Sequence, residues 1–435
     1  MKQGLEYFHE MESKYNLFEY GSEVGEPLWD YIRVSIYNDY IQGHLSHNNE
    51  VKKLSLSLRG VVEMLKGFVV LFKRNKYLFF ICPRDIENKM KFDKISFQLT
   101  ISCPESQRLV LYSMTTNQKV TPKSYSYRLI FYLLRKQIKI KKDYFPFCNE
   151  VKKAVEKCYN ICVDVRNINS LLLEQIIEEK AYLKILSIIK PQKVFCSCDM
   201  MKPIYMASKK MGIKTYELQH AGIVFDYPSY SYPPIVDRKS NIAFADNYVM
   251  FGGSWGLSNN IPANRIVLGN NYFFKETSGV QFDKNYIVIV SDNIHGCYLK
   301  ELAVEIAKKY SDYLIIYKLH PIEFSSYGDY ENFFSQYNNI RIISNQYAMI
   351  DLIKTMSLMV LVYSSSFFEA VSNNKKVAVY KVDNYYCLKG YLEDNPNVLL
   401  FNEVDDLDGF IRQPECYGDW NFYTRFNNEK LKELF

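Results

Sequence analysis

The sequence has few of the residues that break regular structure, and its cysteines lack metal-binding spacing. Glycine and proline account for only 18 and 14 of its 435 residues, which argues against a disordered or collagen-like chain. The 10 cysteines are scattered and no two stand in a CxxC arrangement, so the sequence predicts neither a zinc site nor a redox dithiol. This pattern is typical of a reduced, cytoplasmic protein.

Long hydrophobic runs and a large excess of one charge are also missing. No apolar run reaches the ~18 uncharged residues that a membrane-spanning helix needs. The best segment, 67–82, is interrupted by Lys73, Arg74 and Lys76, and the polar N-terminus does not resemble a signal peptide. Lysine and arginine (54) exceed aspartate and glutamate (48) by only 6, which argues against a nucleic-acid partner.

One segment does concentrate positive charge. Residues 124–144 are helix-like, and Arg135, Lys136 and Lys139 stand there among aromatic and aliphatic residues. A solvated helix face fits this pattern. Contact of residues 135–142 with an anionic membrane surface fits it as well.

Short apolar strands alternate with helices from residue 190 onward, after a mainly helical N-terminal part. The expected strands are 193–198, 214–219, 247–251 and 265–268, followed by 286–290, 313–318, 340–343, 358–363 and 377–380. This alternation predicts an α/β protein with two Rossmann-like, doubly wound parallel-sheet domains. We place the first domain at 1–272 and the second at 273–412, with a helical segment at 413–435 that packs back on the first.

Polar residues follow several of these strands directly. They are His220, Asp292, Asn293, His320, Ser364, Ser365 and Ser366. In an open parallel sheet, ligands bind beyond the carboxyl ends of the strands. We therefore expect these residues to converge on one site.

The serine cluster and the second histidine suit an anionic ligand. The three serines open a helix, where hydroxyls and backbone N–H groups can hold a phosphate, and Glu369 one turn later can accept from ribose hydroxyls. An ordinary helix cap is the alternative. Pro321 fixes the chain after His320, whose imidazole can then donate to a phosphate or to a leaving oxygen.

His220 is the corresponding residue of the first domain. Gly222 allows a tight turn after it, and an imidazole near neutral pH suits removal of a hydroxyl proton. Glu217 lies on the same strand, three residues earlier, so strand alternation places it on the opposite face.

These motifs together resemble bacterial surface-polysaccharide glycosyltransferases of the GT-B type, which have two Rossmann-like domains facing across a cleft. The matching segments are LQHAG at 218–222, FGGSW at 251–255, RIVLGN at 265–270, LHP at 319–321 and SSSFFE at 364–369. A histidine–proline pair with a serine cluster is similar to sialyl-, Kdo- and polyol-phosphate transferases, which use CMP- or CDP-linked donors. EPLWDYIR at 26–33 also looks like an N-terminal pattern of capsule-synthesis proteins.

The resemblance assigns roles to particular positions. His220 and His320 would be catalytic, with His220 as base. The donor would be held by Asp292, Asn293, His320, Pro321, Ser364, Ser365, Ser366 and Glu369, and the acceptor by Glu217, Gln219, Tyr227 and Trp255. Ala221 departs from the histidine–glycine order of many relatives, and no acidic triplet is present, so Asp199 and Asp226 remain alternative bases.

The function implied is transfer of a sugar from a nucleotide-activated donor, CMP-linked or UDP-linked, to a hydroxyl of a growing capsule or lipopolysaccharide O-antigen. The acceptor would be lipid-linked or an oligosaccharide, and the enzyme would lie in the cytoplasm or on the inner face of the cell membrane. No metal or other cofactor is expected, because Asp406 and Asp408 stand in an acidic, surface-like run. The alternatives are a CDP-linked polyol-phosphate transferase, a nucleotide-sugar epimerase and a non-catalytic polysaccharide assembly protein.

Overall fold

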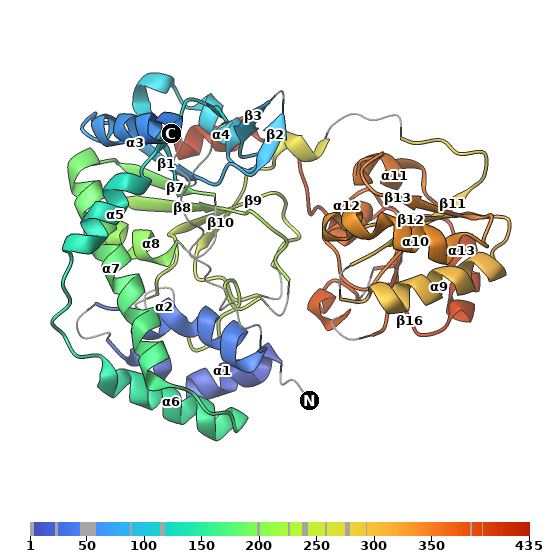
Figure 1. Ribbon diagram of the computed structural model, residues 1–435, viewed down its shortest axis with the longest axis horizontal. Helices are drawn as coiled ribbons and strands as arrows, with labels where there is room; N and C mark the ends of the chain where they lie inside the picture. The colour runs from blue at the N-terminus through green and yellow to red at the C-terminus, as the bar shows by residue number, and fades with distance from the viewer. Residues whose placement is uncertain are drawn as a thin grey trace.

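The computed structural model describes most of the chain. The described residues are 4–21, 25–43, 58–87, 89–113, 118–197, 201–224, 227–236, 242–256, 259–274, 279–292, 294–382, 385–393 and 395–435. They form two α/β bodies that follow one another along the chain (Figure 1).

The first body is built on a parallel sheet. Its strands lie in the order β10-β9-β8-β7-β1-β4-β6, and each neighbouring pair runs parallel. Their bounds are β1 Tyr77–Ile81, β4 Arg108–Tyr112, β6 Tyr125–Ser126, β7 Lys193–Cys196, β8 Lys214–Leu218, β9 Asn247–Met250 and β10 Asn264–Val267. Strands β7 to β10 were predicted from the sequence, whereas β1, β4 and β6 do not appear among the expected strands.

A three-stranded sheet lies beside this one. It consists of β2 Asp85–Glu87, β3 Met90–Phe92 and β5 Val120–Thr121, in the order β2-β3-β5. Two short helices, α4 Phe97–Ser102 and η4 Glu105–Gln107, connect it to β4.

Helices cover the first sheet and extend beyond it. They are α1 Leu5–Lys14, η1 Leu17–Glu19, α2 Leu28–Ser35 with the π-helical turn η3 Ile36–Ile41, α3 Leu58–Val70, α5 Arg128–Gln137, α6 Phe145–Tyr159, α7 Val165–Ile189 and α8 Lys202–Lys210. The long helix α7 joins two cores, because Ile168 and Leu172 pack with α1, α2 and α6 while Ile185 and Ile189 pack on the sheet. Asp164 caps its first turn by accepting from the backbone N–H of Arg166 at 2.9 Å.

The second body repeats the plan with six strands in the order β13-β12-β11-β14-β15-β16, all parallel. They are β11 Tyr286–Val290, β12 Leu314–Lys318, β13 Ile340–Ile343, β14 Leu358–Leu361, β15 Val377–Tyr380 and β16 Val398–Phe401. The helices are η5 Asn271–Phe274 in the connection, α9 Gly296–Lys309, η6 Pro321–Ser326, α10 Tyr327–Phe334, α11 Met349–Thr355, α12 Ser366–Ser372, η7 Tyr385–Leu388, η8 Val404–Asp406 and α13 Leu407–Arg412. Strand β11 is buried throughout, as a central parallel strand requires.

The chain end returns to the first domain. Helix α14, Asn428–Leu434, lies on the first sheet (Figure 1), where the Phe435 ring is 5.0 Å from that of Tyr77 and Lys193 Nζ donates to the Leu434 carbonyl at 2.7 Å.

The architecture confirms the predicted fold class: α/β with two successive Rossmann-like parallel-sheet domains, as the GT-B arrangement requires. One hydrophobic core runs through the junction, since Trp255 of the first domain packs on Phe368 of the second with ring centroids 4.3 Å apart. Within the described residues, no helix is both long and apolar enough to cross a bilayer.

Candidate functional site at the sheet edges

His220 stands just beyond β8 and is held by a tyrosine. The Tyr230 hydroxyl lies 3.3 Å from His220 Nδ1 and donates to buried Glu217 Oε1 at 2.5 Å. Strand alternation had predicted that Glu217 and His220 point apart. The structure links them nevertheless, because Tyr230 reaches both from the loop that follows β8.

This geometry selects the form of the imidazole. The Tyr230 proton is directed to Glu217, so the Tyr230 oxygen accepts from His220 Nδ1–H. The basic nitrogen of His220 is then Nε2. A carboxylate that orients a histidine through a hydroxyl supplies what a general base needs, a fixed tautomer and a fixed ring.

Helix α2, which carries most of the 26–33 motif, supports the loop that contains Tyr230. Arg33 is fully buried, binds Glu12 through Nε at 2.7 Å and Nη2 at 3.0 Å, and also donates to the carbonyls of Pro228 and Ser231. The side chain therefore fixes the backbone on both sides of Tyr230. The 26–33 motif builds the support of the His220 site.

A second buried ion pair completes the support. Lys202 Nζ lies 2.5 Å from Asp30 Oδ1, and Asp30 also accepts from the Tyr232 hydroxyl at 3.0 Å and the Ala243 backbone N–H at 2.6 Å. Burial alone would raise the pKa of Asp30, but Lys202 and Arg33 bring it below its ordinary value.

His320 stands at the end of β12, in the second domain. The ring Nδ1 of His320 accepts from the backbone N–H of Ile322 at 3.3 Å. The backbone N–H of His320 donates to Glu323 Oε2 at 3.0 Å. The neutral ring therefore carries its proton on Nε2. A donor fixed at a strand end suits a phosphate or a leaving oxygen, as predicted for this residue.

A buried polar cluster holds the strand ends around His320 together. Glu323 Oε1 accepts from the Ser291 hydroxyl at 3.0 Å and from the Tyr330 hydroxyl at 2.5 Å. A Cβ on Gly296, the first residue of α9, would meet both Glu323 Oε1 and the Tyr330 oxygen at 3.1 Å. Glycine thus permits the close approach of α9 to this cluster.

The sequence analysis missed His295. Asp292 accepts from the backbone N–H of His295 at 2.7 Å and lies 2.9 Å from its Nδ1, while His295 Nε2 is buried without a hydrogen-bond partner among the described residues. The signal was an Asp-x-x-His spacing that ends at the start of a helix, where the aspartate binds both the backbone and the ring. The predicted residue Asn293 lies outside the described residues.

The serine cluster is less open than expected. The Ser364 hydroxyl accepts from the backbone N–H of Ser366 at 3.2 Å, so part of the helix start is capped internally, and Ser366 is buried while Ser365 is exposed. Ser364 stands two strands from His320 along the sheet edge, since β11 lies between β12 and β14. That spacing corresponds to roughly 10 Å.

The turn after His220 contacts the second domain. A Cβ on Gly222, two residues after His220, would lie 3.2 Å from the Phe368 ring on α12. The turn that carries His220 therefore lies against the helix that follows the serines.

A cavity of about 420 Å³ adjoins the junction and is lined from both domains. Its lining includes Glu369 of α12 and Asn373 just after that helix, the basic residues Lys94, Lys354 and Arg425, and the aromatic residues Tyr272, Phe273 and Tyr423. Burial raises the pKa of Glu369, and nearby Lys94 offsets only part of that effect. Basic and aromatic groups around one carboxyl suit an anionic ligand that carries rings and hydroxyls.

Three residues predicted to bind the acceptor are buried and stabilise the fold, the first being Glu217, which accepts from the Tyr230 hydroxyl. Gln219 is fully buried, with Nε2 donating to the Ala221 carbonyl at 3.0 Å and Oε1 accepting from the Phe251 N–H at 2.9 Å. Trp255 is also fully buried and donates to the Phe422 carbonyl. None of the three side chains is exposed to an acceptor. Tyr227 is half-buried, with its ring 5.2 Å from that of Tyr230.

Four further acidic residues were named in the predictions. Asp199 and Asp226, the alternative bases, lie outside the described residues. Asp406 accepts from the backbone N–H groups of Asn402 and Glu403, and Asp408 lies 2.7 Å from Lys309 Nζ, so both have partners within the domain.

Comparisons with known proteins add similarities of fold. No protein-family model matches the chain, and no curated protein matches it. Among solved structures, the match to MnaA of S. aureus with UDP covers 83% of this chain and 95% of the MnaA chain, at 12% sequence identity and a TM-score of 0.44. The UDP-GlcNAc 2-epimerase of Neisseria meningitidis bound to UDP-GlcNAc covers 82% and 98% at 14% identity, with a TM-score of 0.43.

MurG of Acinetobacter baumannii covers 75% of this chain and 86% of its own, at 11% identity and a TM-score of 0.43. At this level of identity and TM-score, these similarities support no argument about the activity or substrate of the chain.

Proposed function

We propose that this protein is a glycosyltransferase that moves a sugar from a nucleotide-activated donor to a hydroxyl of a surface glycan. The observation that carries the proposal is a contact between the two domains: the turn after His220 packs against α12, with Gly222 next to Phe368. This contact places the His220 turn, with its oriented imidazole, beside the second domain, whose strand ends carry hydrogen-bond donors suited to a phosphate. The order of the motifs along the sequence supports the same reading.

The roles follow from the tautomers. His220 Nε2 takes the proton of the acceptor hydroxyl, and the acceptor oxygen bonds to the anomeric carbon of the donor sugar. The bond from that carbon to the phosphate oxygen breaks, and the nucleotide leaves with the electron pair. His320 Nε2–H stabilises the charge that develops on the phosphate, and His295 Nε2 lies at the next strand end.

The nucleotide occupies the second domain in this proposal, with Glu369 accepting from the ribose. The HP and serine pairing favours a CMP-linked donor, with UDP as the alternative, and a capsule or O-antigen hydroxyl as acceptor. Asp292, Pro321, Ser364, Ser365 and Ser366 shape the phosphate site.

Nucleotide binding tests the proposal. Calorimetry with CMP, CDP, UDP and GDP should give a dissociation constant for at least one nucleotide, weakened about tenfold or more by His320→Gln, since a hydrogen bond to a charged group contributes ~1.5–3 kcal/mol. Glu331→Gln, an exposed change on α10, is the control. If the protein binds none of them, or His320→Gln binds as tightly as the wild type, the donor assignment is wrong. Product mass then separates sugar transfer from polyol-phosphate transfer, because only the second adds phosphorus.

A further inference from the structure

Helix α3 exposes an unusual number of large apolar side chains. Val62, Leu65, Phe68, Val69 and Phe72, the last in the turn after the helix, are between 39% and 65% exposed. The spacing 62, 65, 69 and 72 places them along one side, while Met64, Val70 and Leu71 on the other side are buried. A continuous apolar stripe of this kind on a surface helix marks an interaction site.

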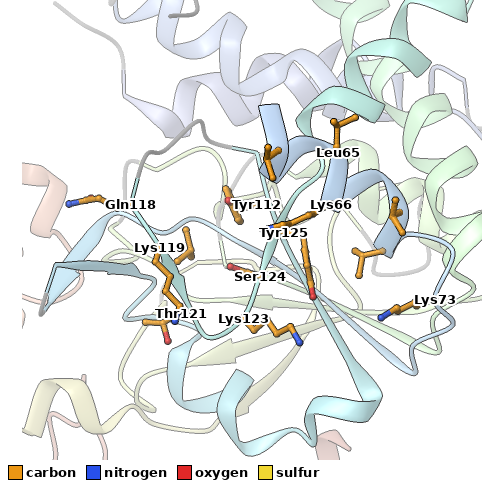
Figure 2. Close-up of a pocket in the computed structure, with 14 residues that line it drawn as sticks. Leu65, Lys66, Lys73, Tyr112, Gln118, Lys119, Thr121, Lys123, Ser124 and Tyr125 are labelled. Atoms are coloured by element: carbon orange, nitrogen blue, oxygen red, sulfur yellow. The ribbon is translucent and has the colours of Figure 1, made fainter. Parts of the chain in front are cut away.

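The stripe borders a cavity of about 1000 Å³, drawn in Figure 2. The cavity lies between α3 and the segments around β4 to β6, with Tyr112 and Val120 among its lining residues. Four lysines line it as well, namely Lys66, Lys73, Lys119 and Lys123, and its lining includes no acidic residue in the part of the chain that the structure describes. Figure 2 shows Lys73, Lys119 and Lys123 spread around its margin.

One of these lysines, Lys123, forms an ion pair at the protein surface. Lys123 lies 3.2 Å from Glu105, but both side chains are about two-thirds exposed, at 66% and 65%, where an ion pair contributes little. An apolar wall with cationic groups at its margin is complementary to a phosphate attached to a hydrocarbon chain.

The neighbouring helix α5 continues the same surface. It contacts α3, and its Tyr132 and Leu133 are 53% and 44% exposed. The basic residues around α5 are partly engaged within the protein, because Arg135 binds Glu174 and Glu178 and Lys142 binds Glu26. The segment 135–142 therefore has less charge available for a membrane than its sequence predicted. We call the surface formed by α3, α5 and the lysine cavity the α3–α5 face.

From these observations we infer that the α3–α5 face binds the surface of an anionic phospholipid bilayer. The apolar stripe enters the interfacial region, and the lysines of the cavity contact lipid phosphates. This binding does not depend on the proposed function. If that function holds, the α3–α5 face also orients the active site relative to the membrane. The cavity lies at the end of β4, and β4 is three strands from β8 in the sheet, a spacing of ~14 Å between the end of β4 and the end of β8 that carries His220.

Vesicle flotation tests the inference. The full-length protein is mixed with phosphatidylcholine vesicles that contain or lack phosphatidylglycerol. We expect binding to the anionic vesicles and its decline in high salt. Lys73→Glu with Lys119→Glu, and separately Val69→Ser with Phe72→Ser, should each reduce the bound fraction on the order of tenfold.

The matched control is Lys430→Glu with Lys432→Glu on α14. This helix packs on one face of the first sheet, whereas α3 packs on the other face. The control should bind as the wild type does. Failure of the wild type to float with anionic vesicles overturns the inference, as does equal loss in the control. A dimer that Val69→Ser with Phe72→Ser dissociates would also overturn it, since the face would then bind a second copy.

Nucleotide calorimetry on the same variants separates this inference from the proposed function. Lost flotation with unchanged nucleotide binding supports a lipid site apart from the donor site. Unchanged flotation overturns the lipid site alone and leaves the donor assignment intact.

Discussion

The first domain uses charged residues in two contrasting ways. Beneath the His220 loop, Arg33, Glu12, Asp30 and Lys202 are buried and paired at short distances. On the α3–α5 face, four lysines line a cavity whose described lining residues include no carboxylate. Buried pairs hold backbone segments in place, because leaving any partner alone in the interior is costly. Charges at the surface contribute little to folding and can contact a ligand from solvent.

The contrast predicts the largest effect for Glu12→Gln. It leaves the Arg33 guanidinium buried without its carboxylate, which should lower the free energy of unfolding by about 3–5 kcal/mol. Urea denaturation measures the loss, with Glu10→Gln on the exposed side of α1 as control. Equal stability of the two variants would contradict the structural role of the 26–33 motif.

Acid should weaken the same region. Burial and the nearby Arg33 lower the pKa of His9 from 6.5 to about 4, so the unfolded chain binds a proton more readily than the folded one. Stability therefore falls as the pH drops from about 6.5 to 4, by about 3 kcal/mol from this group. His9→Gln should reduce this part of the pH dependence, measured as unfolding free energy against pH. An unchanged slope would mean that His9 titrates normally.

Tyr230→Phe should have a smaller effect on stability and a distinct one on activity. It removes the hydroxyl between Glu217 and His220 and should cost about 1–3 kcal/mol. Under the proposed function, sugar transfer should fall on the order of tenfold to a hundredfold, with an altered pH profile, while nucleotide binding stays unchanged. Tyr417→Phe, at an 88% exposed tyrosine, is the control. Full activity of Tyr230→Phe would argue against the His220 tautomer described above.

The lysines of the cavity should matter least for folding. Lys73→Gln with Lys119→Gln should change the free energy of unfolding by less than about 0.5 kcal/mol, as surface changes do. Thermal unfolding measures this directly. A loss as large as that of Glu12→Gln would mean that these lysines belong to the fold.

The sequence located most strands of both sheets because buried parallel strands are short apolar runs bounded by polar residues. Strand β11 is an example, with five apolar or aromatic residues that are all buried. Strands β4, β6 and β16 were not predicted, since β4 is placed by pairing with β1, β6 by pairing with β4, and β16 by pairing with β15.

The candidate site divides in the same way. Histidines and serines at strand ends were visible in the sequence, because the end of a parallel strand is itself a local pattern. The burial of Gln219 and Trp255 could not be predicted from the sequence. It depends on hydrogen bonds from Gln219 to the Phe251 backbone and from Trp255 to the Phe422 backbone. The link from Glu217 to His220 was not visible either, because it depends on how the loop after β8 folds back to bring Tyr230 against both residues.

The sequence by itself determined the α/β class, the order of the two domains and which residues stand at the strand ends, since these depend on local periodicity. Only the tertiary structure decided the tautomers of the two histidines, the burial of the 26–33 motif and the lysine-lined cavity. Each of those depends on which distant segments lie next to one another, and side-chain partners in space cannot be read from spacing along the chain.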